Sequence, residues 1–328
     1  MTVDLESPAE LARLIDPQQR AANARNAELA KALGGGTTVA ELRDLYARGR
    51  VWWHEGGATM AEQRDLTLPG LYGPVAARLY KPVKAANLPV FVFQHGGGFR
   101  IGYPAANDRE MREIAARWGG AVLSIDYVHV PEHVFPDAVL ETAAVFEWLG
   151  ANAGALGLDP DRIAFGGASA GGSVSMGAAI ELRGRRPGLL KAGCLLYTVF
   201  DDTLDDGSMR LFGNGEFFLT RDYCGQIYDS YLPDRAMRAD PRAFAGKLDD
   251  FAGLPPLFIA PAEFDPLRDG AVRFAAKLAA AGHPHRIKVY PKVLHAFFGY
   301  SRLMDRANEL IGDVAAVLTD TLGSGGRR

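Results

Sequence analysis

The pentapeptide Gly167-Ala168-Ser169-Ala170-Gly171 has the G-x-S-x-G spacing of a turn that presents a nucleophilic serine. It follows an apolar segment at 162–166 that we expect to be a strand, and it opens a run of small residues typical of a packed helix. The glycines allow a tight strand-to-helix turn that holds the hydroxyl above the sheet. Ser169 is therefore our candidate nucleophile for acyl transfer. The alternative is that Ser169 only caps a helix packed against the sheet.

A glycine-rich loop, His95-Gly96-Gly97-Gly98, comes directly after an expected strand at 90–94. Acyl transfer forms an oxyanion, and backbone N–H groups that point at this oxygen stabilise it. We expect these donors to be Gly97 and Gly98, together with Ala170, the residue after the serine. The alternative is a phosphate-binding loop, but the chain has no G-x-G-x-x-G and no Walker A sequence to support it.

A serine nucleophile needs a general base, which in α/β hydrolases follows it in the chain. Three histidines lie far enough downstream of Ser169. His283 and His285 flank a proline in a polar turn, where we expect them to be solvated. His295 follows the expected strand at 286–290, at the edge of the sheet where ligands bind. We therefore predict that His295 is the base, the alternative being a buried packing histidine.

The base in turn needs an acid that orients its ring. Asp265 follows the expected strand at 256–262, and Pro266 behind it is typical of a helix start. This placement keeps the carboxylate in a loop at the same edge of the sheet. Asp265 is our first choice, and Glu263 is the second.

The elements that must position these residues alternate between strands and helices, which predicts an α/β fold with a mainly parallel sheet covered on both faces. The eight expected strands span 64–68, 75–80, 90–94, 121–126, 162–166, 193–199, 256–262 and 286–290. The expected helices between and after them span 107–118, 135–149, 169–182, 268–281 and 301–322.

Two segments stand outside this alternation. Residues 1–60 are expected to form an N-terminal cap with helices at 8–33 and 38–48. Residues 61–328 form the catalytic domain, within which 200–253 is long enough to be a second cap segment. This second segment begins with a cluster of four aspartates and contains an expected helix near 223–231. The aspartates fit a solvated loop, or alternatively a sensor for a cationic substrate group; they are Asp201, Asp202, Asp205 and Asp206.

The composition excludes several other classes of protein. A net charge of −3 over 328 residues gives no field that would draw the chain onto nucleic acid. The two cysteines exclude a disulfide framework and favour a reducing compartment. No apolar run approaches 18 residues and no secretory signal is recognisable, so we expect a cytoplasmic protein without membrane insertion.

Taken together, the motifs resemble the bacterial branch of the hormone-sensitive lipase family of α/β-hydrolase esterases. The resemblance covers about residues 62–322. It rests on five segments in the family order, namely HGGGF at 95–99, DYVHVPEHVFP at 126–136, GGASAGG at 166–172, DPLRD at 265–269 and LHAFF at 294–298.

The resemblance implies a serine carboxylesterase with an eight-stranded α/β-hydrolase fold, a helical cap, no metal and no organic cofactor. Its triad falls on Ser169, Asp265 and His295, and its oxyanion donors fall on Gly97, Gly98 and Ala170. It also implies a short-acyl ester substrate and allows a homodimer. An apolar substrate pocket is expected to be lined by Phe99, Tyr103, Phe200, Phe212, Phe218 and Phe297, which are equally suited to a plain core.

Three positions depart from the family pattern. Ala168 replaces an aspartate before the nucleophile, His129 stands in a Y-R-L-A-P-E segment that here reads YVHVPE, and Ala296 replaces the glycine after the base. These departures leave substrate preference open. One alternative is an amidase that removes an N-acyl group from a small metabolite, and another is a non-catalytic ligand-binding protein on the same fold.

Overall fold

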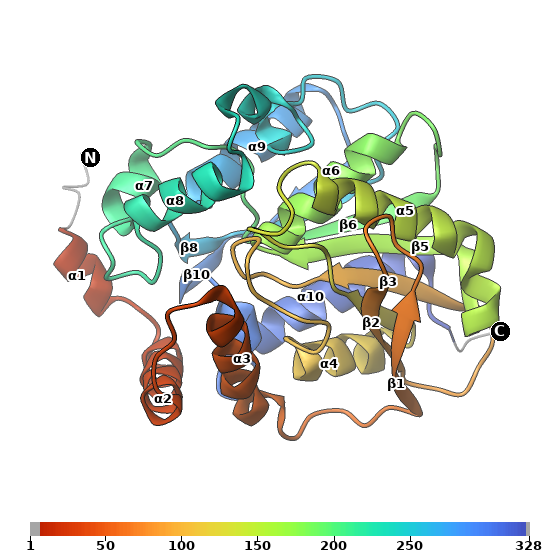
Figure 1. Ribbon diagram of the computed structural model, residues 1–328, viewed down its shortest axis with the longest axis horizontal. Helices are drawn as coiled ribbons and strands as arrows, with labels where there is room; N and C mark the ends of the chain where they lie inside the picture. The colour runs from red at the N-terminus through yellow and green to blue at the C-terminus, as the bar shows by residue number, and fades with distance from the viewer. Residues whose placement is uncertain (1–6, 326–328) are drawn as a thin grey trace.

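A computed structural model describes residues 7–325, so the first six residues of the expected cap and the last three of the catalytic domain lie outside it. An eight-stranded sheet forms its centre (Figure 1). The strand order is β1-β2-β4-β3-β5-β6-β7-β9, and all pairs except β1–β2 and β2–β4 are parallel. The strands are β1 (Glu62–Leu68), β2 (Val75–Lys81), β3 (Leu88–Gln94), β4 (Ala121–Ile125), β5 (Leu158–Ala168), β6 (Leu190–Leu196), β7 (Leu257–Ala260) and β9 (His285–Ile287).

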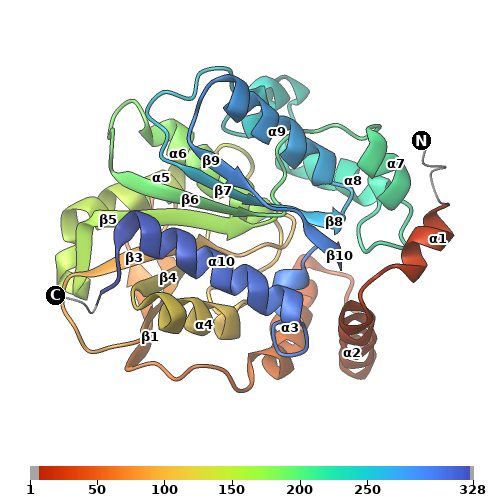
Figure 2. The same cartoon turned by 180° about the vertical axis from the view of Figure 1, so that it is seen from behind.

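Both faces of this sheet are buried, because side chains on a strand alternate between the two faces. Within β3, Val90 and Val92 pack on one side, whereas Phe91 and Phe93 pack on the other. The first side is covered by α5 (Asp137–Asn152), α6 (Ala170–Leu182) and α9 (Arg268–Ala280). The second is covered by α4 (Asp108–Trp118) and α10 (Asp305–Leu322), which lie in front of the sheet in Figure 2.

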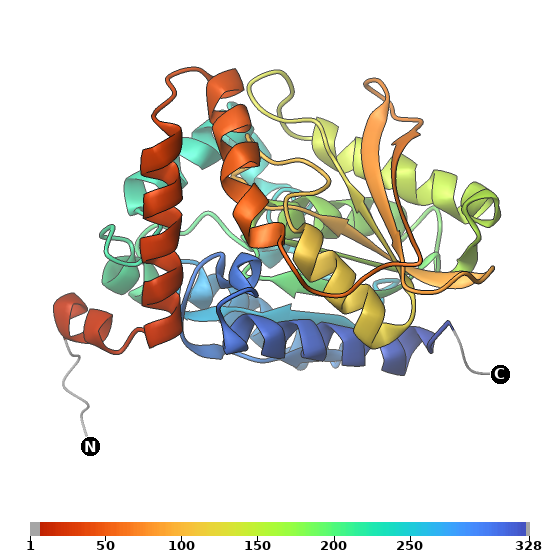
Figure 3. The same cartoon turned by 90° about the horizontal axis from the view of Figure 1, so that it is seen from below.

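The expected single helix at 8–33 is in fact two helices, α1 (Pro8–Arg13) and α2 (Pro17–Leu33). Pro17 cannot continue a helix from the preceding turn, and the Asp16 carboxylate caps the new helix by accepting from the Gln18 N–H. The next helix is α3 (Val39–Arg50), which lies beside α2 (Figure 3).

The segment at 200–253 contains two helices, α7 (Gly207–Phe212) and α8 (Arg221–Tyr231). The second agrees with the expected helix, but α7 was not predicted, because a helix of six residues carries too little periodicity. Asp206 caps it by accepting from the Met209 N–H at 2.9 Å. No helix in the described range 7–325 is long and apolar enough to cross a membrane.

Two of the expected strands are interrupted, and the interruptions form a second sheet. The segment at 256–262 divides into β7 and β8 (Ala262–Phe264), and the segment at 286–290 divides into β9 and β10 (Tyr290–Leu294). Strands β8 and β10 pair with each other in parallel, with Leu294 opposite Phe264. The closing helix, α10, also begins later than expected, at Asp305, because Met304 before it is extended, with a φ of −116° and a ψ of 122°.

Candidate active site

Ser169 stands at a strained turn between β5 and α6. Its φ of 53° and ψ of −124° lie in a region that residues with a side chain rarely adopt. A Cβ on Gly171 would collide with the carbonyl groups of Gln94 and His95, so only glycine fits there. The turn thus holds the Ser169 side chain out from the carboxyl end of β5, as the G-x-S-x-G spacing predicts.

His295 and Asp265 are brought together by the small sheet. Because Leu294 of β10 lies opposite Phe264 of β8, the next residue of each strand leaves the same edge side by side. The Asp265 Oδ2 lies 2.8 Å from His295 Nδ1, and His295 Nε2 lies 2.9 Å from the Ser169 Oγ. The Asp265 Oδ1 accepts from the Leu267 N–H at 2.9 Å, which fixes the carboxylate. The three side chains form a continuous Ser–His–Asp chain of contacts.

The alternatives to these residues lie elsewhere. The Glu263 carboxylate accepts from the backbone N–H of Lys292 at 2.7 Å, so it is turned toward β10. His283 Nε2 lies 3.2 Å from the Leu254 carbonyl, and His285 Nδ1 lies 2.9 Å from the carbonyl of His283. None of the three faces the Ser169 hydroxyl.

The glycine-rich loop lies against the nucleophile turn. Gly97 has a φ of 131° and Gly98 a φ of 61°, and a Cβ on Gly97 would collide with the Ile101 carbonyl. The backbone N–H groups of Gly97, Gly98 and Ala170 have no acceptor among the described residues. All three residues line the same cavity as Ser169. The Ala170 N–H also belongs to the first turn of α6, where the helix dipole favours negative charge.

A cavity of about 880 Å³ opens above these groups. Its floor contains Ser169 and His295, and its walls come from α2, α3, α8 and the loop before α8. Most of the wall side chains are apolar, including Leu29, Leu33, Leu42, Leu45, Leu219 and Ile227. Apolar walls over a few polar groups are typical of a site for a small organic molecule.

Two of the six aromatic residues expected in the pocket line this cavity, Phe99 and Phe218. Phe99 is buried and its ring stacks on Tyr231 at 3.8 Å between centroids. Phe218 is half-exposed, and its ring lies nearly parallel to His295 with 6.2 Å between centroids. Phe218 is therefore the aromatic side chain of this pair that stands beside the candidate base.

The other four expected pocket residues do not line the cavity, and that expectation is corrected. Their rings pack against other aromatic rings instead: Tyr103 on Tyr46, Phe200 on Phe274, Phe212 on Phe217 and Phe297 on Tyr197. Aromatic residues near an active edge serve the core as readily as the pocket, so residue type alone does not separate the two roles.

The sequence reasoning did not single out the wall residues of α2, α3 and α8. The 3.6-residue spacing of Leu29 and Leu33 indicates an apolar helix face, but not whether it faces a core or a cavity. Cys224 of α8 also lines the cavity. Burial raises the pKa of its thiol to about 12, so it stays protonated and offers no competing nucleophile.

Helix α3 is tied to the rest of the molecule by arginine side chains. Arg43 donates two hydrogen bonds of 2.8 Å to the Glu132 carboxylate and one of 2.9 Å to the Arg100 carbonyl. Arg50 is buried and donates to the carbonyls of Ala106 and Gly299. These contacts hold α3 above the glycine-rich loop and beside His295.

Three of the four clustered aspartates, Asp201, Asp202 and Asp206, form ion pairs with nearby cations. Arg273 contacts both Asp201 and Asp206, at 2.7 and 2.8 Å. Lys247 lies 3.1 Å from Asp202. None of the four aspartates lines the cavity, so they do not face a bound substrate.

Comparison with known proteins agrees with this architecture. Residues 91–299 match a family model described as the alpha/beta hydrolase fold, which spans more than half of the chain. The chain belongs to this hormone-sensitive-lipase-like family of α/β hydrolases.

Solved structures of esterases superimpose over most of the chain. A thermostable carboxylesterase cloned from a metagenomic library is 32% identical, with a TM-score of 0.83, covering 87% of this chain and 98% of its own. An esterase from the archaeon Pyrobaculum calidifontis is 30% identical, with a TM-score of 0.82 and coverages of 87% and 94%. An ester hydrolase from the metagenome of Lake Arreo, in complex with a phosphonate derivative, is 28% identical, with a TM-score of 0.84 and coverages of 93% and 98%. The chain is thus similar to esterases throughout its catalytic region.

Proposed function

We propose that this protein is a serine carboxylesterase that works through an acyl-enzyme on Ser169. The observation that carries the proposal is the contact chain from Ser169 Oγ to His295 Nε2 at 2.9 Å and from His295 Nδ1 to Asp265 at 2.8 Å. This is the geometry in which an imidazole takes the proton of an attacking hydroxyl. The similarity to structures described as esterases supports the same assignment.

In the proposed mechanism, Ser169 Oγ attacks the ester carbonyl carbon while His295 accepts its proton. Asp265 keeps the proton of the imidazole on Nδ1 and stabilises the imidazolium. The N–H groups of Gly97, Gly98 and Ala170 bind the oxyanion. The C–O bond to the alcohol then breaks as His295 returns the proton to the leaving oxygen. Water attacks the acyl-enzyme by the same route and releases the acid and free Ser169.

The proposed substrate is a carboxylic ester with a short acyl group and an apolar remainder. The apolar walls of the cavity favour the apolar remainder, because each buried CH₂ contributes about 0.8 kcal/mol to binding. The short acyl group follows from the family resemblance alone. We further propose that residues 1–60 and 200–253 act as a two-part cap, because α2, α3 and α8 all contribute to the cavity wall.

The structure does not support the observation on which the amidase alternative was based. It relied on four aspartates that would recognise a cationic substrate. None of them lines the cavity, and three of them are paired with Arg273 or Lys247. We therefore keep amide hydrolysis only as an outcome of the test.

The test is a comparison of kcat/KM for p-nitrophenyl acetate, butyrate and octanoate with a panel of N-acetyl amines. We expect the esters to be preferred, and the acetate and butyrate to exceed the octanoate. Ser169→Ala serves as the control for background hydrolysis. A higher kcat/KM for an amide would overturn the esterase assignment, and a preference for octanoate would overturn the short-acyl assignment alone.

A further inference from the structure

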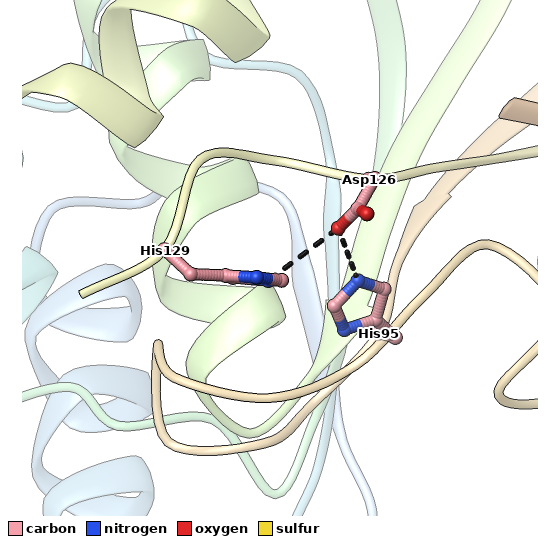
Figure 4. A group of neighbouring side chains, drawn as sticks. All are labelled: His95, Asp126 and His129. Carbon is pink, nitrogen blue, oxygen red and sulfur yellow. Dashed lines mark hydrogen bonds and ion pairs between the residues drawn. The ribbon is translucent and has the colours of Figure 1, made fainter. Parts of the chain in front are cut away.

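Three side chains outside the Ser–His–Asp chain converge beside the glycine-rich loop (Figure 4). His95 follows the last residue of β3, and Asp126 follows the last residue of β4. Because Gln94 and Ile125 lie in register on these parallel strands, the two side chains leave the sheet next to each other. His129, three residues further on, returns its ring toward the same carboxylate.

The spacing of the three ligand atoms suits a metal ion. The Asp126 Oδ1 lies 3.0 Å from His95 Nε2 and 3.4 Å from His129 Nε2, and all three atoms lie within 4.8 Å of one another. A tetrahedral Zn²⁺ with bonds of about 2.0–2.1 Å requires ligand atoms about 3.3 Å apart. The two separations from Asp126 bracket this value, and the two histidine nitrogens lie within 4.8 Å of each other.

The ring of His95 lies between two acceptors. Its Nδ1 is 2.9 Å from the Gly96 carbonyl oxygen and its Nε2 is 3.0 Å from the Asp126 Oδ1. A neutral imidazole carries one N–H, so it can donate to only one of these oxygens and faces the other with a lone pair. A cation beside the Asp126 carboxylate would relieve this repulsion when the proton is on Nδ1.

His129 supplies a second, independent indication. Its side chain is about nine-tenths buried, and its Nε2 has no hydrogen-bond partner among the described residues, because the approach to Asp126 lacks hydrogen-bond geometry. A buried polar nitrogen without a partner destabilises the folded state, so its retention calls for an explanation. A metal ion in the cluster would accept this lone pair.

We propose that His95, Asp126 and His129 bind one divalent transition-metal ion of the Zn²⁺ type. Two imidazoles and one carboxylate are a donor set that such ions prefer, and the partly exposed Asp126 leaves room for water ligands. The Gly96 carbonyl and the Tyr127 N–H, which donates to Asp126 Oδ1 at 3.1 Å, would orient the ligands. The site would tie the start of the glycine-rich loop to the segment after β4.

This proposal goes beyond the sequence expectation of no metal, and the ester chemistry does not depend on it. The family motif gave no reason to expect it, because His129 occupies the position where the Y-R-L-A-P-E pattern has leucine. The residue that completes the cluster is therefore a departure of this chain from the pattern.

The test measures binding of the metal alone to the untagged full chain after chelator treatment and dialysis. We expect isothermal titration with ZnCl₂ to give one ion per chain, and Co²⁺ to show visible d–d absorption. His129→Leu should weaken Zn²⁺ binding at least about 10-fold. The matched control is His133→Leu, because His133 lies in the same segment and pairs with Asp137 at 2.9 Å outside the cluster.

Added Zn²⁺ should also raise the Tm of the wild type and of His133→Leu, but not that of His129→Leu. Circular dichroism checks that each variant is folded, and Asp126→Asn provides a second cluster variant that should also bind Zn²⁺ more weakly. The proposal is overturned if the folded wild type binds no Zn²⁺ at about 1 mM. It is equally overturned if His129→Leu and His133→Leu bind alike, since the ion would then reside on other groups.

Discussion

The carboxyl-terminal end of the sheet, which carries Ser169, and the helices that cover it are held in place in different ways. Every side chain of β3 is buried, and so are nearly all those of α6. By contrast, the buried residues of α2 are only Gln19 and Ala22, and that of α3 is only Arg50. Dense packing fixes the reacting groups, whereas a few hydrogen bonds position the cap. We therefore expect substitutions at the edge to affect kcat, and substitutions in the cap to affect mainly KM and stability.

The largest effect should come from the acid of the proposed triad. Asp265→Asn keeps an oxygen for the Leu267 N–H but no longer holds His295 in the reactive tautomer, so kcat should fall about 10⁴-fold. Glu263→Gln is the matched control, because Glu263 lies nearby and the hydrogen bond given for its carboxylate comes from the Lys292 N–H of β10, not from His295. Steady-state kinetics on an acetate ester measure both. An equal loss in the two variants would contradict the assignment of Asp265.

A smaller loss is expected in the glycine-rich loop. Gly97→Ala places a Cβ against the Ile101 carbonyl at a φ of 131°, so the loop must shift and at least one oxyanion donor is misplaced. We expect kcat to fall about 10²–10³-fold with little change in KM. Gly154→Ala, whose Cβ would meet no atom within 4 Å, is the control for a glycine replacement that leaves activity unchanged. Retention of full activity in Gly97→Ala would exclude this loop from the mechanism.

A substitution in the cap should change stability and KM more than it changes kcat. Glu132→Gln weakens the paired hydrogen bonds from Arg43, at a cost of about 0.5–1 kcal/mol because the pair is partly exposed. We expect KM to rise more than kcat falls. Asp44→Asn, which removes an ion pair within α3 only, should leave KM unchanged. A larger effect on kcat than on KM would contradict the expectation that cap residues act mainly on KM and stability.

The same pair should give a stability difference that depends on pH. The hydrogen bonds from Arg43 lower the pKa of Glu132 to about 2, from an ordinary value of 4.5. A lowered carboxyl pKa stabilises the folded state above the ordinary value, and this stabilisation is lost as the pH falls from about 4.5 to about 2. The Tm difference between wild type and Glu132→Gln should therefore shrink over that range. A constant difference would show that the charge of Glu132 does not stabilise the cap.

The smallest expected effect is a gain in stability from a substitution next to His295. Ala296 follows His295 with a φ of 66°, a conformation that costs a residue with a Cβ about 1–2 kcal/mol. Ala296→Gly removes this strain, partly offset by the greater freedom of glycine in the unfolded chain, so a net gain of up to about 1 kcal/mol is expected. Urea unfolding measures it. A loss of stability would show that the alanine methyl group contributes packing that outweighs the strain.

More of the reactive residues than of the residues around them could be predicted from the sequence. The motifs around Ser169 and Gly97 are local, because each lies within five residues that form a single turn. The succession of strands and helices along the chain likewise follows from alternating apolar segments, but the order of the strands within the sheet does not. His295 and Asp265 could be expected at the same edge, but not their pairing, because β8 and β10 arise from breaks in β7 and β9 that carry no pattern of their own.

The cavity walls and the His95–Asp126–His129 cluster could not be predicted for a similar reason. Tyr103 and Phe218 are both aromatic, yet Tyr103 packs edge-on against Tyr46 and Phe218 stands beside His295. Likewise, His95 and His129 meet only because β3 and β4 are adjacent and parallel. Such contacts between distant segments depend on packing that periodicity does not encode.

The central claim is that Ser169 forms the covalent intermediate, and a fluorophosphonate probe tests it directly. Mass spectrometry of the intact protein should show one label per wild-type chain, located on the peptide that contains Ser169. Folded Ser169→Ala should take up no label and hydrolyse no ester. A label of equal stoichiometry on Ser169→Ala, or a wild type that stays unlabelled, would contradict the account.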